Sequence, residues 1–417
     1  MMTRKAAMFG MLGLAGVLLA LAFRNLQVMA VSLAVIAFVV AALYSRPSPL
    51  TVSRETAAGR MFEGDRCRTA LAVGNAGGTA SGLLEIYDNV SDRMRVRSGR
   101  NRAIAVLQPE GALRLHYSLE TPLRGCHAIG PVSVREQDLL GFCNHETVIG
   151  GTDELVVMPA SENVEDFASG SRRVRPYPGP KLCRRPGGGM DFCSIRDYIK
   201  GDPLRRINWK LLAKRGELMV NEFEKEAISD VLVIIDAREV STAGTTSCNP
   251  LEYAVKGASS LFRYFIAQKD RVGLVIYGSR VEVVPQGCGG RHLDDLQAHL
   301  TYLEGKGSIT FGEAMTIVQP YLAPGTAIVV ISPLEFDPTL TAKAVELWSM
   351  GHPLIILSPV PFQFERVATG RGDPKFELLR FERCNFMDTI RSYGIEVVDW
   401  TPEMTVYELI QRCVHAR

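Results

Sequence analysis

The chain lacks the short motifs by which many hydrolases and nucleotide-binding proteins are recognised. Its 417 residues contain no G-x-x-x-x-G-K-[ST] phosphate loop, no G-x-S-x-G nucleophile elbow and no H-E-x-x-H metal pair. Its 7 histidines are scattered along the chain. We therefore expect no catalytic residue, no bound metal and no cofactor, and predict that the protein is not an enzyme. A cryptic hydrolase, assembled only by folding, is an open alternative.

An excess of charge of one sign is also missing. The 47 basic and 45 acidic residues leave a net charge of +2, so no overall field attracts nucleic acid, and no nucleic-acid partner is expected. The 9 cysteines are odd in number and show no C-x-x-C spacing. They are predicted to be reduced thiols in a cytosolic environment.

Two long apolar runs open the chain, at 6–23 and 26–44, separated only by Arg24 and Asn25. Each is long enough to cross a hydrocarbon core of about 30 Å. We predict a transmembrane hairpin within 1–46 that contacts the lipid bilayer through residues 6–44. A secretory signal is disfavoured because a second apolar run follows at once. Basic residues flank both ends of the hairpin, which predicts an integral protein of the cell membrane with cytoplasmic soluble domains.

Residues 51–159 alternate polar and apolar side chains in short runs that are separated by turn residues. This pattern predicts an all-β sandwich domain of about seven strands, similar to an immunoglobulin-like module.

Residues 160–190 form a predicted linker that is rich in glycine, proline and basic residues, a composition that favours no regular element. A basic linker near a bilayer is attracted to anionic lipid. Binding of an anionic lipid or another polyanion through this linker is therefore an alternative function.

Continuous apolar runs, beginning with 231–236, alternate with helical patterns through residues 227–417. Helices are predicted at 249–268, 291–304, 311–321, 339–350 and 402–413, and a short extra strand at 281–284. Alternation of this kind predicts a doubly wound, mostly parallel α/β sheet. The expected fold class is thus multidomain: transmembrane hairpin, immunoglobulin-like β-sandwich and α/β domain.

Residues 191–226 are dense in charge and lie between the two differently patterned regions. Gly201 allows a turn, Asp202 is a candidate cap, and a helix is predicted from Pro203 to Arg215, ending at Gly216. Its apolar stripe comprises Leu204, Ile207, Leu211 and Leu212.

The run 195–226 resembles the signature of the domain of unknown function 58 family. The matching positions are Arg196, Tyr198, Gly201, Asp202, Arg206, Ile207, Trp209, Ala213, Gly216, Leu218, Val220 and Glu226. The resemblance implies that the α/β domain is similar to a von Willebrand factor type A domain. It also implies a link with MoxR-type AAA+ ATPases.

A metal-binding type A domain carries D-x-S-x-S after its first strand, with oxygen ligands for Mg²⁺. Here Asp236, Arg238 and Val240 occupy those places, Ile309 stands where a threonine is wanted, and a later strand ends in Ser332. Asp236 is therefore expected to mark a degenerate metal position, and to pair with Arg238 or to cap the following turn.

These observations favour a non-enzymatic, membrane-tethered scaffold that engages a protein partner, such as a MoxR-type ATPase or its client. Tryptophan and arginine often dominate interface energies. The candidate partner-binding residues are Arg196, Tyr198, Asp202, Arg205, Arg206, Asn208, Trp209 and Lys210. The alternative is that the same side chains form an internal clamp between the domains.

Overall fold

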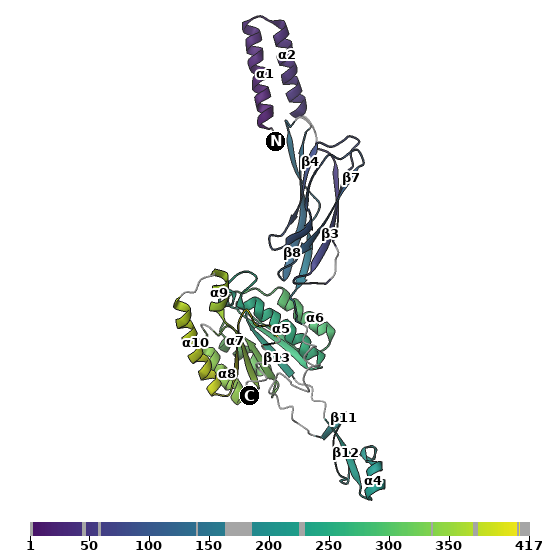
Figure 1. The fold of residues 1–417 in the computed structure, drawn as a ribbon, viewed down its shortest axis with the longest axis vertical. Coiled ribbons are helices and arrows are strands. Elements are labelled where there is room, and N and C mark those ends of the chain that lie inside the picture. The colour runs from purple at the N-terminus through teal and green to yellow at the C-terminus, as the bar shows by residue number, and fades with distance from the viewer. Residues whose placement is uncertain are drawn as a thin grey trace. The chain divides into compact units, whose positions relative to one another are not determined.

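The computed structural model describes residues 3–43, 47–56, 60–138, 141–162, 186–224, 230–334, 337–369, 374–406 and 408. The chain divides into two compact units, Met1–Pro159 and Ala160–Arg417, which are taken in turn below (Figure 1). Most of the basic linker expected at 160–190 lies outside the described residues, so the lipid-binding alternative stays a prediction.

Two antiparallel helices, α1 (Arg4–Ala22) and α2 (Leu26–Leu43), open the first unit. They approach closely because small residues line their contact. A Cβ atom added at Gly16 would lie 2.3 Å from Ser32 Oγ. By length and composition α1 can cross a membrane, whereas Leu26–Ala41 forms a shorter apolar helix. A crossing by both helices stays a prediction.

Two antiparallel-rich sheets follow the hairpin. The first has the order β1-β3-β7-β5, and the second the order β2-β10-β8-β4-β6, with β9 paired to β8. Their bounds are β1 (Leu50–Thr56), β2 (Met61–Phe62), β3 (Arg66–Asn75), β4 (Leu83–Val90), β5 (Arg95–Gly99), β6 (Arg102–Ala105), β7 (Ala112–Glu120), β8 (Gly125–Gln137), β9 (Asn144–Ile149) and β10 (Asp153–Met158). The expected number of about seven strands is too low, because strands as short as β2 and β6 do not show a clear alternation.

A buried ion pair joins the two sheets of this region. Arg54 of β1 donates to both carboxylate oxygens of Asp88 on β4, at 2.6 and 3.1 Å. The Tyr117 hydroxyl donates to the same carboxylate at 2.6 Å. Burial and this hydrogen bond raise the pKa of Tyr117 above its ordinary value. The core of this region therefore contains a charged crosslink that the hydrophobic pattern did not predict.

The second unit contains a six-stranded sheet with the order β15-β14-β13-β16-β17-β18. The strands are β13 (Asp230–Asp236), β14 (Arg271–Tyr277), β15 (Val281–Gly287), β16 (Ala327–Ile331), β17 (Leu354–Pro359) and β18 (Glu396–Trp400). All neighbours pair in parallel except β14 and β15. The mostly parallel sheet is therefore confirmed, and its antiparallel strand lies at one edge.

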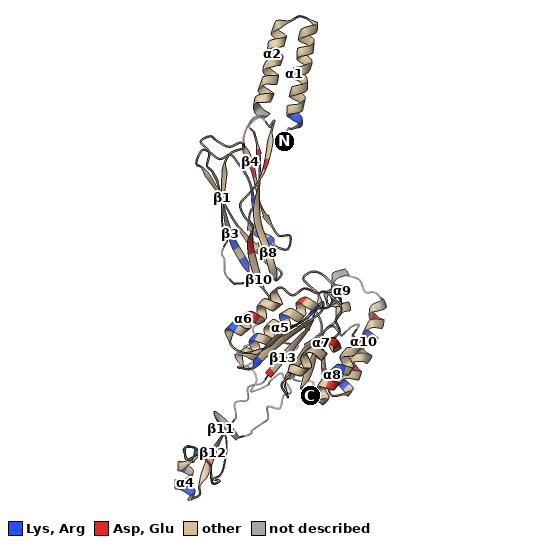
Figure 2. Ribbon diagram, turned by 180° about the vertical axis from the view of Figure 1, so that it is seen from behind, with Lys and Arg blue, Asp and Glu red and all other residues tan. Residues whose placement is uncertain are grey.

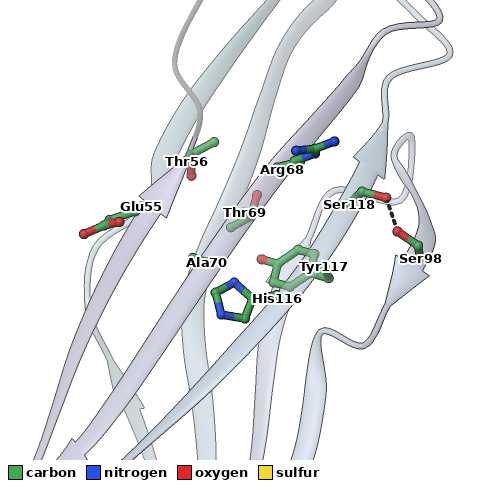
Figure 3. Close-up of a pocket in the computed structure, with 9 residues that line it drawn as sticks. All are labelled: Glu55, Thr56, Arg68, Thr69, Ala70, Ser98, His116, Tyr117 and Ser118. Carbon is green, nitrogen blue, oxygen red and sulfur yellow. Dashed lines mark hydrogen bonds between the residues drawn. The ribbon is translucent and has the colours of Figure 1, made fainter.

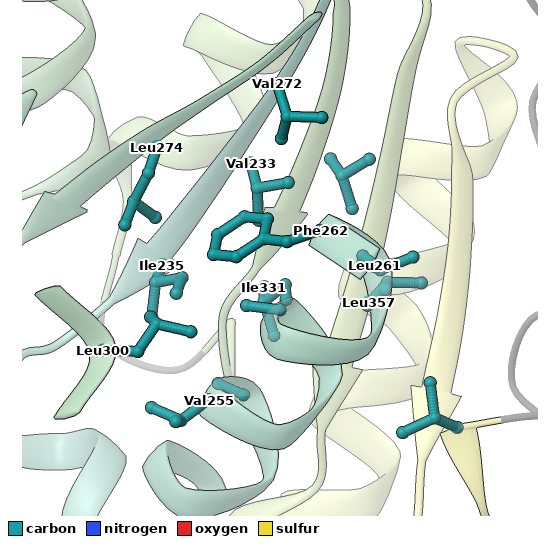
Figure 4. Packing of buried hydrophobic residues seen from close by; sticks show 14 of the residues in the cluster. Val233, Ile235, Val255, Leu261, Phe262, Val272, Leu274, Leu300, Ile331 and Leu357 are labelled. Atoms are coloured by element: carbon teal, nitrogen blue, oxygen red, sulfur yellow. The ribbon is translucent and has the colours of Figure 1, made fainter. Parts of the chain in front are cut away.

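Apolar clusters cover both faces of this sheet because successive residues of a strand point to opposite sides. Val233 and Ile235 pack on one face, where Phe262 of helix α5 lies over them (Figure 4). Leu232 and Ile234 pack on the other face.

The helices of this unit are α5 (Pro250–Ala267), α6 (Gly290–Thr301), α7 (Phe311–Val318), α8 (Thr339–Ser349), α9 (Pro361–Thr369) and α10 (Pro374–Ser392). The first four agree with the predicted helices within a few residues. Helices α9 and α10 were not predicted, since α10 is rich in charge and polar residues. The start predicted for the helix at 402–413 is too early, because residues 402 and 403 form a turn. The end of this predicted helix, residues 409–413, lies outside the described residues.

The charge-dense segment forms a small ribbon and helix within the second unit. Strand β11 (Pro186–Asp197) pairs antiparallel with β12 (Met219–Glu224). Between them lie the 3-10 helix η2 (Leu204–Arg206) and helix α4 (Trp209–Arg215). Strand β11 thus begins inside the stretch 160–190, which was predicted to contain no regular element. We call residues 194–224 the signature module.

Candidate functional site

Asp236 ends strand β13 at the carboxyl edge of the sheet, where α/β proteins commonly bind ligands. Both of its oxygens face Arg238. The guanidinium donates to Asp236 at 2.7 to 3.2 Å, and the Arg238 backbone N–H donates to Oδ1 at 3.0 Å. Asp236 therefore both pairs with Arg238 and caps the turn that follows the strand.

Further polar groups converge on this pair. The Ser332 hydroxyl at the end of β16 donates to Asp236 Oδ2 at 2.8 Å. Asp337 Oδ2 lies 3.8 Å from Arg238 Nη1, and the Tyr277 ring centroid lies 5.9 Å from the guanidinium carbon. All of these side chains are buried. A protein cation thus lies between two buried carboxylates, which does not fit a divalent metal at the same place.

The electrostatics of the cluster keep it charged. Burial lowers the pKa of Arg238, but the hydrogen bond and charge of Asp236 outweigh it, so that this pKa is raised overall. Burial raises the pKa of the Tyr277 hydroxyl well above its ordinary value. Arg238 is therefore a permanent countercharge, and Tyr277 remains a neutral phenol.

Asp337 also joins the starts of two helices. Its Oδ2 accepts the backbone N–H of Phe311 at 2.7 Å, and its Oδ1 accepts the Thr339 N–H and hydroxyl at 3.1 and 2.6 Å. These contacts place one carboxylate at the amino ends of α7 and α8, where a negative charge is favourable. Asp337 was not among the predicted site residues, because it lies several residues beyond the end of β16 and belongs to no recognisable motif.

Loop 304–309 crosses the carboxyl edge of β13 and β14. The Lys306 N–H donates to Ala237 O at 2.8 Å, and the Ile309 N–H donates to Gly278 O at 3.0 Å. A Cβ atom at Gly278 would lie 2.6 Å from both Ala237 O and Lys306 O, so only glycine permits this close backbone approach. The loop covers the edge by main-chain contacts.

A second buried arginine, Arg383 of α10, lies along the same edge. It donates to Pro333 O at 2.6 Å, to Ser358 Oγ at 2.6 Å and to Asp399 Oδ1 at 2.8 Å. Within the described ranges, no group of three or more His, Cys, Asp or Glu side chains is placed to hold a metal ion. The ion pairs and hydrogen bonds of Arg238 and Arg383 thus hold the loops at this edge to the ends of the strands.

The signature module brings together all eight candidate partner-binding residues but gives them different tasks. Arg196 donates to both oxygens of Asp202 at 2.7 and 2.8 Å, and Asp202 also accepts the Ile199 N–H. The hydrogen bond from Arg196 lowers the pKa of Asp202 to about 2. Asp202 therefore closes the 199–202 turn. The prediction that it caps a helix is wrong.

The helix predicted from Pro203 to Arg215 is wrong in its first half. The 3-10 helix η2 ends at Arg206, and Ile207 is extended and forms a bridge with Val220 of β12. Asn208 then caps α4 by accepting the Leu211 N–H at 3.1 Å, and Gly216 ends it with φ of 74°. A β-branched residue paired to a strand and a strong capping residue explain the break.

Exposure divides the remaining residues of the module. Ile207 is 6% exposed, whereas Leu204, expected on the same stripe, is 67% exposed. Trp209 is 61% exposed, and Arg205 and Lys210 are exposed beside it. Arg206 and Tyr198 are half-buried, as is Asn208, whose side chain donates to Asn221 Oδ1 at 2.8 Å. The outward-facing group is therefore Arg205, Trp209 and Lys210.

Hollows also occur elsewhere among the described residues. One of about 500 Å³ on the β-rich region is lined by polar side chains, with Ser98 and Ser118 hydroxyls 2.6 Å apart (Figure 3). The second, of about 760 Å³, lies beside β15 and α6, and Glu282 there pairs with Arg280 at 2.6 Å. Neither the Ser98–Ser118 contact nor the Arg280–Glu282 pair joins a nucleophile to an adjacent base.

One cysteine–histidine contact bears on the hydrolase alternative. Cys143 Sγ lies 3.4 Å from His145 Nε2 at the start of β9. The thiol belongs to a residue that is 4% exposed, next to Phe142, which packs against the bases of α1 and α2. A substrate has no direct path to this sulfur, so the contact favours a structural role.

Several solved structures match about a quarter of the chain. Trypsin-activated alpha-2-macroglobulin from Escherichia coli matches with a TM-score of 0.23 and 19% identity, over 27% of this chain and 7% of that one. A FixG-related protein from Vibrio parahaemolyticus matches with a TM-score of 0.19 and 12% identity, over 27% of this chain and 98% of that one. At these TM-scores the matches assign neither fold nor function.

A curated relative and a family model match more specifically. The uncharacterized protein YeaD of Bacillus subtilis (strain 168) is 24% identical over 198 residues, which is 45% of this chain and 45% of that protein. The chain therefore spans less than half the length of this relative. Residues 194–334 match the family described as "Protein of unknown function DUF58", a range that starts in β11 and includes the signature module, Asp236 and Ser332. Over residues 194–334 this protein is therefore similar to proteins of the DUF58 family.

Proposed function

We propose that the protein is a non-enzymatic adaptor, tethered to the cell membrane by its N-terminal hairpin, which engages a protein partner through the signature module. The observation that carries this proposal is the 61% exposure of Trp209 on a short helix whose ends are both defined by capping residues. An exposed tryptophan flanked by arginine and lysine is the composition from which interface hot spots are built.

The arrangement of the α/β sheet supports a von Willebrand factor type A-like domain as part of the proposal. From the centre of the sheet, the strands run β13, β14, β15 toward one edge and β16, β17, β18 toward the other. The antiparallel strand β15 lies at the first of these edges. The guanidinium of Arg238 stands where Mg²⁺ would need open oxygen ligands. We infer a degenerate domain of this kind, which uses its surface and not a metal. The β-rich region would then be an immunoglobulin-like spacer.

The partner proposed from the family resemblance is a MoxR-type AAA+ ATPase or its client. The orientation proposed for the hairpin, with both ends in the cytoplasm, would place the signature module where a cytosolic ATPase can reach it.

The test is co-purification from native membranes in mild detergent with the MoxR-type ATPase of the same genome. We expect Arg205→Ala and Lys210→Ala each to lower the recovered ATPase several-fold while melting as the unchanged protein does, because both side chains are exposed. Arg380→Ala, which removes an exposed cation of α10, is the matched control. Equal recovery with all variants, or unfolding by both module variants, would favour the internal-clamp alternative.

A further inference from the structure

The part of the signature module that contains η2 and α4 has a surplus of positive charge. Residues 203–215 include five basic side chains and no acidic one, and the colouring of α4 in Figure 2 makes this visible. The five are Arg205, Arg206, Lys210, Lys214 and Arg215. Among the described side chains of this module, Arg196 pairs with Asp202, and the charge of the half-buried Arg206 also acts on Asp202. The other four cations are exposed, so their charge can reach a partner.

Two large apolar side chains stand among these cations. Leu204 is 67% and Trp209 is 61% exposed, and they flank the buried bridge between Ile207 and Val220. Since that bridge and the Asn208 cap define the backbone here, little backbone freedom remains to be lost when Trp209 enters a pocket.

The cationic patch is small and has acidic borders. Asp197, at the end of β11, and Glu217, just after the C-cap of α4, are both exposed. A bilayer with uniform negative charge would also approach these carboxylates and be repelled by them. A protein surface of limited size can contact the cations without approaching the carboxylates. A helix that lies on a membrane also buries a continuous apolar face. In α4, Leu211 and Leu212 are half-buried, and Trp209 is its exposed large apolar side chain.

We propose that η2 and α4 bind an acidic protein surface that has an apolar pocket for Trp209. The cations accelerate the encounter, and Trp209 sets the lifetime of the complex. This inference rests on the proposed function and adds the chemistry of the partner surface.

The experiment measures association and dissociation rates between the full chain in neutral-lipid nanodiscs and the purified MoxR-type ATPase of the same genome. The variants are Lys210→Glu with Lys214→Glu, and Trp209→Ala; Arg380→Glu in α10 is the control with the same kind of charge change at another exposed helical site. We expect the double reversal to slow association about tenfold at about 50 mM salt, and much less at about 400 mM, where screening is stronger. Trp209→Ala should accelerate dissociation about tenfold at both salt concentrations.

The outcomes separate the two proposals. If the unchanged chain does not bind the ATPase, the proposed function fails and this inference with it. If it binds, but the double reversal leaves association and its salt dependence unchanged, or Trp209→Ala leaves dissociation unchanged, the inference alone is overturned. Binding of the unchanged chain to vesicles rich in phosphatidylglycerol that is lost in the double reversal, with ATPase binding intact, would assign the patch to lipid and also overturn it.

Discussion

At the scale of single residues, the molecule uses buried arginines where its sheet ends. Arg238 neutralises Asp236 and lies near Asp337, and Arg383 pairs with Asp399 farther along the edge. Charged groups away from water are tolerated only when they are paired and hydrogen-bonded. The contacts of Arg238 are therefore a requirement for folding of this edge.

We predict that Arg238→Ala lowers the free energy of unfolding of the second unit by about 3 to 5 kcal/mol, because it leaves two buried carboxylates without their countercharge. Arg271→Ala removes a half-exposed arginine 3.5 Å from Asp230 and should change this free energy by less than about 1 kcal/mol. Urea unfolding followed by tryptophan fluorescence reports on this unit, since all 3 tryptophans, Trp209, Trp348 and Trp400, belong to it. Equal urea midpoints for the two variants would show that the buried ion pairs of Arg238 contribute little to the stability of this unit.

At the scale of elements, the signature module is stabilised by contacts between strand and turn, and not by one continuous helix. Ile207 pairs with Val220, and the Asn208 N–H donates to Met219 O at 2.8 Å. A ribbon of two strands alone is marginal in water, so these contacts matter for its stability. The same bridge directs Trp209 outward.

We predict that Ile207→Ala weakens the module by about 2 to 4 kcal/mol, as expected when a buried branched side chain is truncated. Leu204→Ala, three residues earlier and largely exposed, should change it by less than about 0.5 kcal/mol. Hydrogen exchange of the β12 amides measures the difference directly. Unchanged protection in Ile207→Ala would mean that β12 is held by other contacts.

At the scale of the whole molecule, the proposed orientation can be read out through cysteines. Cys126, Cys288 and Cys384 are free and exposed, whereas Cys67 and Cys143 are buried. The first three are natural reporters, one in the first unit and two in the second.

We predict that a membrane-impermeant thiol reagent leaves these cysteines unlabelled in intact cells and labels them after permeabilisation, because both ends of the hairpin are proposed to be cytoplasmic. Asn25→Cys, in the turn between α1 and α2, is the positive control and should be labelled in intact cells. Labelling of Cys126 or Cys288 without permeabilisation would contradict the orientation and the proposed cytosolic partner.

The sequence alone was sufficient for features that are encoded within a short window. The apolar run 231–236 predicted β13, Asn249 and Pro250 predicted the start of α5, and the signature residues predicted the match to the DUF58 family model. Such features depend on side-chain periodicity and on capping residues that act over one or two turns. Arg238 next to Asp236 was also within reach, because the two residues are close in sequence.

Only the tertiary structure decided what depends on segments far apart in the chain. Strand β12 pairs with Ile207 and removes it from the helix that its local sequence favours, and the carboxyl edge is reached by Asp337, just before α8, and by Arg383 of α10. Neither residue can be recognised from its neighbours in sequence. Each is needed because it pairs with a charged or polar group that folding buries, and that partner lies far away in the chain. The direction in which Trp209 points was decided in the same way, by the bridge between Ile207 and Val220, which are 13 residues apart in the chain.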